Sequence, residues 1–63
     1  MKVRDVIKRI EDDGWYYIGT VGSHRHYKHP TKPGKTTVPG HPSKDVPTGT
    51  LAGIWKQSGL PKP

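Results

Sequence analysis

The 63-residue sequence has no cysteine and no long apolar run, and these absences exclude several classes of protein. Without cysteine there is neither a disulfide framework nor a thiolate metal site, which fits a reducing compartment. No stretch approaches the roughly 18 apolar residues that a membrane helix needs, and the charged start from Lys2 to Asp5 leads into no apolar signal segment. We therefore expect one small, soluble, cytoplasmic domain over residues 1–63, stabilised by packing alone.

Acidic residues are scarce in the later part of the chain. Four of the five lie in the first thirteen positions, and from Gly14 to Pro63 only Asp45 opposes seven lysine or arginine residues. The net charge is +6, which is large for a chain of this size. Such a surface favours a polyanionic partner, with nucleic acid first and an acidic protein second.

Several catalytic signatures are also missing. The sequence contains no Walker-type phosphate loop, no G-x-S-x-G elbow and no catalytic carboxylate pair. Four histidines remain as candidate metal ligands, but carboxylates are nearly absent around them and the region is strongly positive. We expect neither a metal site nor a cofactor. The histidines are His24, His26, His29 and His41.

One stretch, from Gly22 to Pro30, holds three of the histidines, two basic residues and a tyrosine. It predicts a turn followed by a strand that Pro30 closes. On a strand, His24, His26 and Lys28 share one side, and residues two apart on that side lie about 6 to 7 Å from each other, a span that brackets a phosphate. Neutral imidazole accepts a proton near pH 7, and a nearby cation stabilises a transferring phosphoryl group. The alternative is that these are ordinary solvated histidines of a basic surface.

The chain as a whole predicts a helix, three strands and a second helix. Apolar residues at i, i+3, i+4 and i+7 predict an amphipathic helix that Gly14 ends, and aromatic or β-branched runs between Gly/Pro turns predict the strands. Two amphipathic helices need the same apolar sheet face. The fold class is therefore α+β, with both helices on one face of a three-stranded antiparallel sheet. The expected elements are helix 3–13, strands 15–21, 24–29 and 35–38, and helix 49–58.

The sequence also predicts where the helices begin and where the aromatic side chains lie. The first helix has two possible starts, because Asp5 suits the N-cap of a shorter helix while Val3 extends the apolar stripe. Thr48 or Thr50 is the expected N-cap of the second helix. We expect Trp15 and Trp55 in the core, because both lie on or beside apolar stripes. We expect Tyr16 and Tyr17 on opposite faces of the sheet, because side chains alternate along a strand.

Short motifs follow one another along almost the whole chain, and together they resemble the HicA toxins of bacterial and archaeal toxin-antitoxin modules. The resemblance implies a double-stranded-RNA-binding-domain-like fold, in agreement with the element order. It also implies an mRNA interferase, a small ribonuclease that stops translation until a HicB antitoxin blocks it. The motifs are Val6-Ile7 with Ile10, Asp13-Gly14-Trp15, Gly22-Ser23-His24, Tyr27, His29-Pro30, Thr37-Val38-Pro39-Gly40-His41, Gly49-Thr50-Leu51 with Ile54, and Gln57 with Gly59-Leu60.

The resemblance implies that His24, in Gly-Ser-His, is the catalytic histidine, whereas the family often has an apolar residue where this chain has His26. We hypothesise metal-independent RNA cleavage in which His24 takes a proton from a ribose 2'-hydroxyl. Nearby cations stabilise the phosphorane, and His26 or His41 protonates the leaving oxygen. Auxiliary or RNA-binding candidates are Ser23, Arg25, His26, Lys28 and His41.

Two other functions are compatible with the same sequence. A non-catalytic double-stranded RNA-binding module would use the same basic sheet for shape and phosphate contacts, but it has no need of His24 in its Gly-Ser-His context. The basic surface is also suited to dock an acidic protein, which for a toxin includes its antitoxin. We expect RNA and a HicB-type antitoxin as partners, no membrane, and a monomer when the chain is free.

Overall fold

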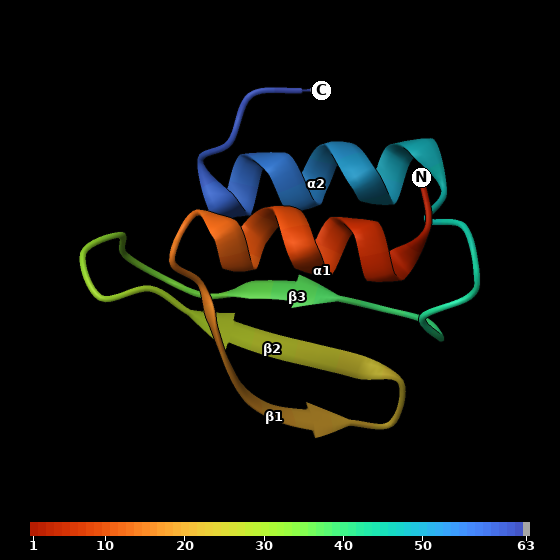
Figure 1. The fold of residues 1–63 in the computed structure, drawn as a ribbon, viewed down its shortest axis with the longest axis horizontal. Helices are drawn as coiled ribbons and strands as arrows, with labels where there is room; N and C mark the ends of the chain where they lie inside the picture. Colours follow the sequence, from red (N-terminus) through yellow and green to blue (C-terminus); the bar gives the residue numbers. More distant parts are fainter. Residues whose placement is uncertain (63) are drawn as a thin grey trace.

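A computed structural model describes residues 1–62 and shows three antiparallel strands covered on one face by two helices (Figure 1). The sheet order is β1-β2-β3, and both helices run in the same direction (Figure 1). The predicted α+β architecture is confirmed, and the elements start and end within one residue of the expected positions. Across residues 1–62, neither helix combines the length and apolar character needed to cross a membrane. The elements are α1 (Val3–Asp12), β1 (Tyr16–Val21), β2 (His24–Lys28), β3 (Thr36–Val38) and α2 (Thr48–Ser58).

The core lies between the helices and the sheet. The apolar stripe of α1 is buried except for Ile7, which is partly buried, and Trp15 and Trp55 are buried as the sequence predicts. Tyr27 of β2 is also in the core, where burial is the main cause of a raised pKa of its phenol. Each buried aliphatic side chain contributes about 1.5–3 kcal/mol relative to exposure. The core residues are Val3, Val6, Ile10, Trp15, Tyr27, Val38, Val46, Ile54 and Trp55.

The start of α1 is capped by a distant loop. The helix begins at Val3, so Asp5 lies in its first turn and is not the cap. The amide of Val3 donates to the Lys44 carbonyl at 2.8 Å, and the amide of Arg4 donates to the Pro42 carbonyl at 3.1 Å. These carbonyls satisfy amides that a helix start leaves without an internal partner. The polar, Pro-rich segment after β3 is therefore docked on α1.

The two ends of α2 differ in how well the sequence predicts them. The expected N-cap at Thr48 or Thr50 is wrong, because the helix already begins at Thr48. The N-cap residue is Pro47, whose extended backbone leads into the helix and whose carbonyl accepts the first bond, from Leu51, at 2.9 Å. At the other end Gly59 adopts the left-handed conformation, with φ of +71°, and ends the helix as predicted.

Candidate active site on the open face of the sheet

The strand register divides the sheet into a covered face and an open face. Tyr27 is 2% exposed and lies opposite Tyr17 and Thr36, which defines the covered face. Side chains alternate along a strand, so the residues on either side of Tyr27 point to the other face, which neither helix covers. Residues directly opposite each other in an antiparallel pair share a face. The open face carries His24, His26 and Lys28 of β2, Tyr16, Gly19 and Val21 of β1, and Thr37 of β3.

His24 is the first residue of β2 and its side chain is exposed. It follows a turn at Gly22, which has φ of +61° and so favours glycine, and it pairs with Val21 across the hairpin. Within residues 1–62, the His24 ring makes no hydrogen bond. Both ring nitrogens are therefore free to meet a substrate, and the neutral ring offers a proton acceptor.

His26 lies two residues further on the same face and is held in place. Its Nδ1 atom is 3.0 Å from the hydroxyl oxygen of Thr37 on β3. The ring is partly buried, and Nε2 has no hydrogen-bond partner in the described part of the chain. Opposite His26 stands Gly19, which has no side chain and follows an irregularity in the register after Tyr17. The ring therefore faces open space on its β1 side.

The far end of the open face pairs an aromatic ring with a cation. Tyr16 is 51% exposed and lies directly opposite Lys28, which is also exposed. Lys28 is four residues from His24, or about 13 Å along the strand. A phosphate held at Lys28 is thus that of a neighbouring nucleotide. This end suits base stacking and a phosphate contact.

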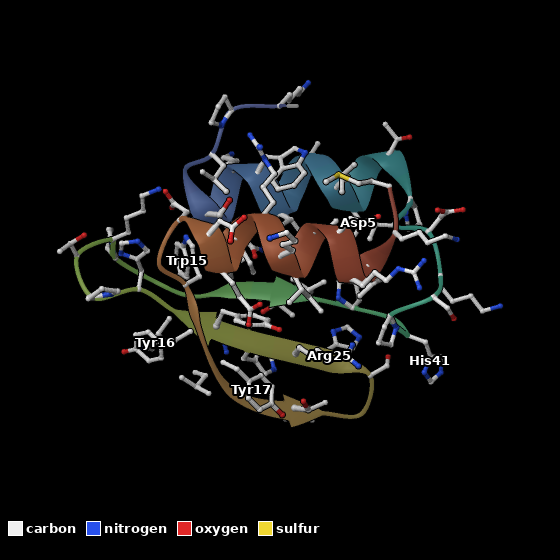
Figure 2. The ribbon with its side chains drawn as sticks, viewed as in Figure 1. Asp5, Trp15, Tyr16, Tyr17, Arg25 and His41 are labelled. Atoms are coloured by element: carbon white, nitrogen blue, oxygen red, sulfur yellow. The ribbon has the colours of Figure 1, made fainter. Side chains whose placement is uncertain are left out.

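Three candidates from the sequence remain, and they are Ser23, Arg25 and His41. Ser23 and His41 lie near the His24 end of β2, whereas the Arg25 side chain points to the covered face. Arg25 lies on the covered face, away from His24, and its guanidinium donates to the Gly40 carbonyl at 2.7 Å. The Gly40 amide in turn donates to the Ser23 carbonyl at 3.1 Å. His41 is exposed on the loop that follows, beside this end of the sheet (Figure 2). The structure therefore brings Ser23, His24 and His41 to one end and makes Arg25 an anchor for the loop.

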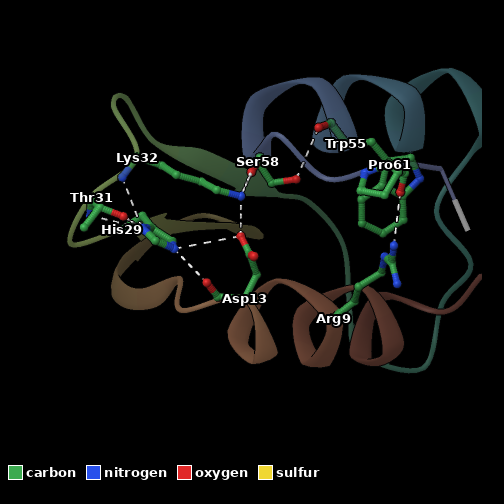
Figure 3. A network of polar contacts seen from close by, with 8 residues as sticks. All are labelled: Arg9, Asp13, His29, Thr31, Lys32, Trp55, Ser58 and Pro61. Atoms are coloured by element: carbon green, nitrogen blue, oxygen red, sulfur yellow. Dashed lines mark hydrogen bonds and ion pairs between the residues drawn. The ribbon is translucent and has the colours of Figure 1, made fainter.

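His29, in contrast, is a structural residue. Its side chain is 9% exposed, and its ring packs edge-on against Trp15 with centroids 5.2 Å apart. Nδ1 accepts bonds from the amides of Thr31 and Lys32, each at 3.1 Å, so this nitrogen carries no proton. Nε2 lies 2.7 Å from the Asp13 carbonyl and must donate to it. Both ring nitrogens are therefore engaged by the protein (Figure 3).

Lys32 extends these contacts to the C-terminal ends of both helices (Figure 3). We call His29, Asp13, Trp15, Lys32 and Ser58 the His29 cluster. The Lys32 ammonium lies 2.5 Å from the Asp13 carboxylate and donates to the Ser58 carbonyl at 3.0 Å. A cation at a helix C-terminus interacts favourably with the helix dipole. The hydrogen bond from Lys32 is also the main reason that the pKa of the Asp13 carboxyl falls below its ordinary value. This cluster explains why acidic Asp13 is tolerated at the end of α1.

The sequence alone does not predict this structural role of His29, which there is only one of four histidines. The available signal was that Asp13-Gly14 and His29-Pro30 both belong to the motifs that resemble the HicA family. Gly14 has φ of +107°, and a Cβ atom there would lie 2.8 Å from Nε2 of His29. Asp13-Gly14 and His29-Pro30 therefore contact each other in the folded chain.

Two further features of the described surface concern metal and nucleic-acid binding. Over residues 1–62, no three His, Cys, Asp or Glu side chains form a group suited to hold a metal ion. A shallow hollow over α1 is lined in part by Asp5, Asp12 and Asp13. Lys8 and Arg9 line the hollow beside these carboxylates, so its charges largely cancel. Among the described residues, the open face carries Lys28 and no acidic side chain, and it is therefore the better candidate for nucleic acid.

Comparison with known proteins places this chain in a family. The family model for the HicA toxin of bacterial toxin-antitoxin modules matches residues 3–60, which include both helices, all three strands, the open face and the His29 cluster. A comparison with curated individual proteins gives no match. The match covers nearly the whole chain, and so the chain belongs to the HicA toxin family.

Proposed function

We propose that this toxin is an endoribonuclease that cleaves mRNA, with His24 as the general base. The observation that carries the proposal is the environment of His24. Its ring is exposed and unbonded within the described residues, on an uncovered sheet face that it shares with His26 and Lys28. A net charge of +6 attracts the RNA backbone to the chain.

The proposed reaction uses the ribose of the substrate as the nucleophile. Neutral His24 takes the proton from a 2'-hydroxyl, and that oxygen attacks the adjacent phosphorus. The bond from phosphorus to the 5'-oxygen of the next nucleotide breaks, and this oxygen leaves with a proton from a general acid. The products are a 2',3'-cyclic phosphate and a 5'-hydroxyl. DNA has no 2'-hydroxyl, so we expect it to bind without being cut.

The other end of the open face positions the RNA. A base stacked on Tyr16 contributes about 1–3 kcal/mol to binding, as such contacts do in single-strand-binding proteins. Lys28, directly opposite, neutralises a neighbouring phosphate. These contacts fix the strand along β2, so the reacting phosphate lies at the histidines.

Membership of a toxin-antitoxin family implies pairing with an antitoxin. We propose a HicB-type antitoxin that inhibits the toxin by covering the open face, because this face has no intramolecular cover. An acidic surface complements the basic chain and excludes RNA by the same electrostatics that bind it. We further propose that the free toxin is a cytoplasmic monomer.

The test is incubation of purified wild type and His24→Ala with a long single-stranded RNA in EDTA, followed by mapping of the fragment ends. We expect wild type to leave cyclic phosphate ends, and His24→Ala to bind RNA without cutting it. An oligonucleotide with a single 2'-deoxy sugar at a mapped site should resist cleavage at that site only. Ends carrying 5'-phosphate, or cleavage that EDTA abolishes, would refute the mechanism. Binding by wild type without any cleavage would instead indicate a non-catalytic RNA-binding module.

A further inference from the structure

We infer that His26, held by Thr37, is the general acid that protonates the leaving 5'-oxygen. The inference rests on the proposed ribonuclease function and assigns the second half of its proton transfer. In-line displacement places the attacking 2'-oxygen and the leaving 5'-oxygen on opposite sides of the phosphorus. The reaction therefore needs two proton-transfer groups that bracket one phosphate.

His24 and His26 meet this spacing requirement. They lie two residues apart on β2 and point to the same face, as their partners Val21 and Gly19 on β1 show. Two residues along a strand correspond to about 6 to 7 Å. A phosphate between the two rings meets one ring from the attacking side and the other from the leaving side.

The contact with Thr37 orients His26 as a donor. In the protonated ring, Nδ1–H donates to the Thr37 hydroxyl oxygen, 3.0 Å away, and Nε2–H remains as the donor for substrate. Thr37 is itself fixed, because its amide donates to the side-chain carbonyl of Gln57 on α2 at 2.9 Å. A locked ring loses less rotational freedom on reaching the reactive geometry.

The strand opposite His26 leaves room for the leaving nucleotide. Gly19 faces His26, and a Cβ atom built at Gly19 would meet no atom within 4 Å. The neighbouring open-face positions on β1 carry large side chains, Tyr16 and Val21. The gap therefore occurs at the ring that we assign as the acid.

The other candidate donors fit less well. Both ring nitrogens of His29 are engaged in the structural cluster. Arg25 lies on the covered face and binds Gly40. His41 is exposed on a loop, and nothing in the described part of the chain holds its ring. His26 alone combines a fixed orientation with a free nitrogen on the face that carries His24.

The test uses an RNA oligonucleotide whose 5'-oxygen at the cleaved bond is replaced by sulfur, because a thiolate leaves without protonation. We expect His26→Ala to cut ordinary RNA about 10²- to 10⁴-fold more slowly than wild type. With the sulfur substrate, its rate should return to within a few-fold of wild type. His24→Ala should stay inactive on both substrates, because it lacks the base.

Variants of Thr37 test the positioning role. Thr37→Val removes the hydroxyl and should show a smaller, sulfur-rescued loss in kcat, whereas Thr37→Ser keeps the hydroxyl and should retain activity. Thr50→Val, at an exposed position on α2, is the matched control and should cut both substrates at the wild-type rate. His26→Gln replaces His26→Ala if the alanine variant has a lowered unfolding midpoint.

Two results would overturn the inference while leaving the ribonuclease proposal intact. In one, a folded His26→Ala cuts ordinary RNA at the wild-type rate or keeps its defect with the sulfur substrate. In the other, His41→Ala shows the sulfur-rescued defect, which assigns the acid to the loop. If wild type cuts neither substrate, the ribonuclease proposal itself fails.

Discussion

His24 and His29 are only five residues apart, yet the structure gives them opposite environments. The His29 side chain is 9% exposed, and both of its nitrogens are bonded, while His24 is exposed and its ring is free of protein partners within residues 1–62. The His29 ring holds α1 against the loop before β3, and the His24 ring faces solvent on β2. Which histidine is available for chemistry thus depends on the hydrogen bonds around the ring.

The largest expected effect is on stability at His29. His29→Ala removes the hydrogen bonds of both ring nitrogens and the contact with Trp15, and it leaves the Asp13 carbonyl poorly satisfied. We expect the free energy of unfolding in urea to fall by about 3 kcal/mol. For His24→Ala the change should be within about 0.5 kcal/mol. Equal losses for the two variants would contradict the contrast between them.

A smaller loss is expected at the glycine that contacts His29. Gly14→Ala must hold a side chain at φ of +107° and push the His29 ring away from a Cβ atom 2.8 Å from Nε2. We expect a loss of about 2 kcal/mol in urea unfolding. Gly22→Ala is the matched control, because its φ is +61° but its Cβ lies in open space. It should lose only about 1 kcal/mol, and a loss equal to that of Gly14→Ala would show that the His29 contact is unimportant.

The same cluster should make stability depend on acid pH. Lys32 lowers the pKa of the Asp13 carboxyl in the folded state, so Asp13 binds protons more weakly when folded than when unfolded. Its contribution is therefore complete above the ordinary aspartate pKa of about 3.9 and is lost as pH falls through the lowered value. Asp13→Asn and Lys32→Met should each flatten the fall in thermal midpoint below about pH 4. An unchanged pH profile in both would refute this linkage.

The smallest expected effect concerns RNA affinity on the open face. Lys28→Gln should weaken binding uniformly across sequences and reduce the slope of log affinity against log salt by about 0.7, the value for one single-strand phosphate contact. Lys56→Gln, an exposed lysine on α2, removes the same charge from the helix side of the molecule. It should leave the slope nearly unchanged, and equal changes would mean that RNA has no preference for the open face.

The element order was predictable because each signal is local. The apolar spacing of the first helix, the glycines after each helix and the Gly/Pro turns depend on near neighbours in sequence. The start of α1 was less predictable because its hydrogen-bond partners are distant in sequence. The amides of Val3 and Arg4 bond to carbonyls some 40 residues away, and Pro47 takes the place expected for a threonine cap.

The site was predictable in part for the same reason. Alternation along β2 places His24, His26 and Lys28 on one face, with Arg25 opposite. The β1 side of the face was out of reach, because the register shifts between Tyr17 and Gly19. This shift brings Tyr16 and Val21, an odd number of residues apart, to the same face. No local pattern fixes such a shift, although a glycine within a strand often marks one.

The most direct test of the central claim is the single-turnover cleavage rate of His24→Ala and His29→Ala on one RNA, at a temperature where both are folded. The claim is that His24 serves the reaction and His29 serves the fold. It predicts that His24→Ala keeps the wild-type unfolding midpoint and loses cleavage, whereas His29→Ala has a lowered midpoint and retains the wild-type rate within a few-fold. A folded but inactive His29→Ala beside an active His24→Ala would contradict it.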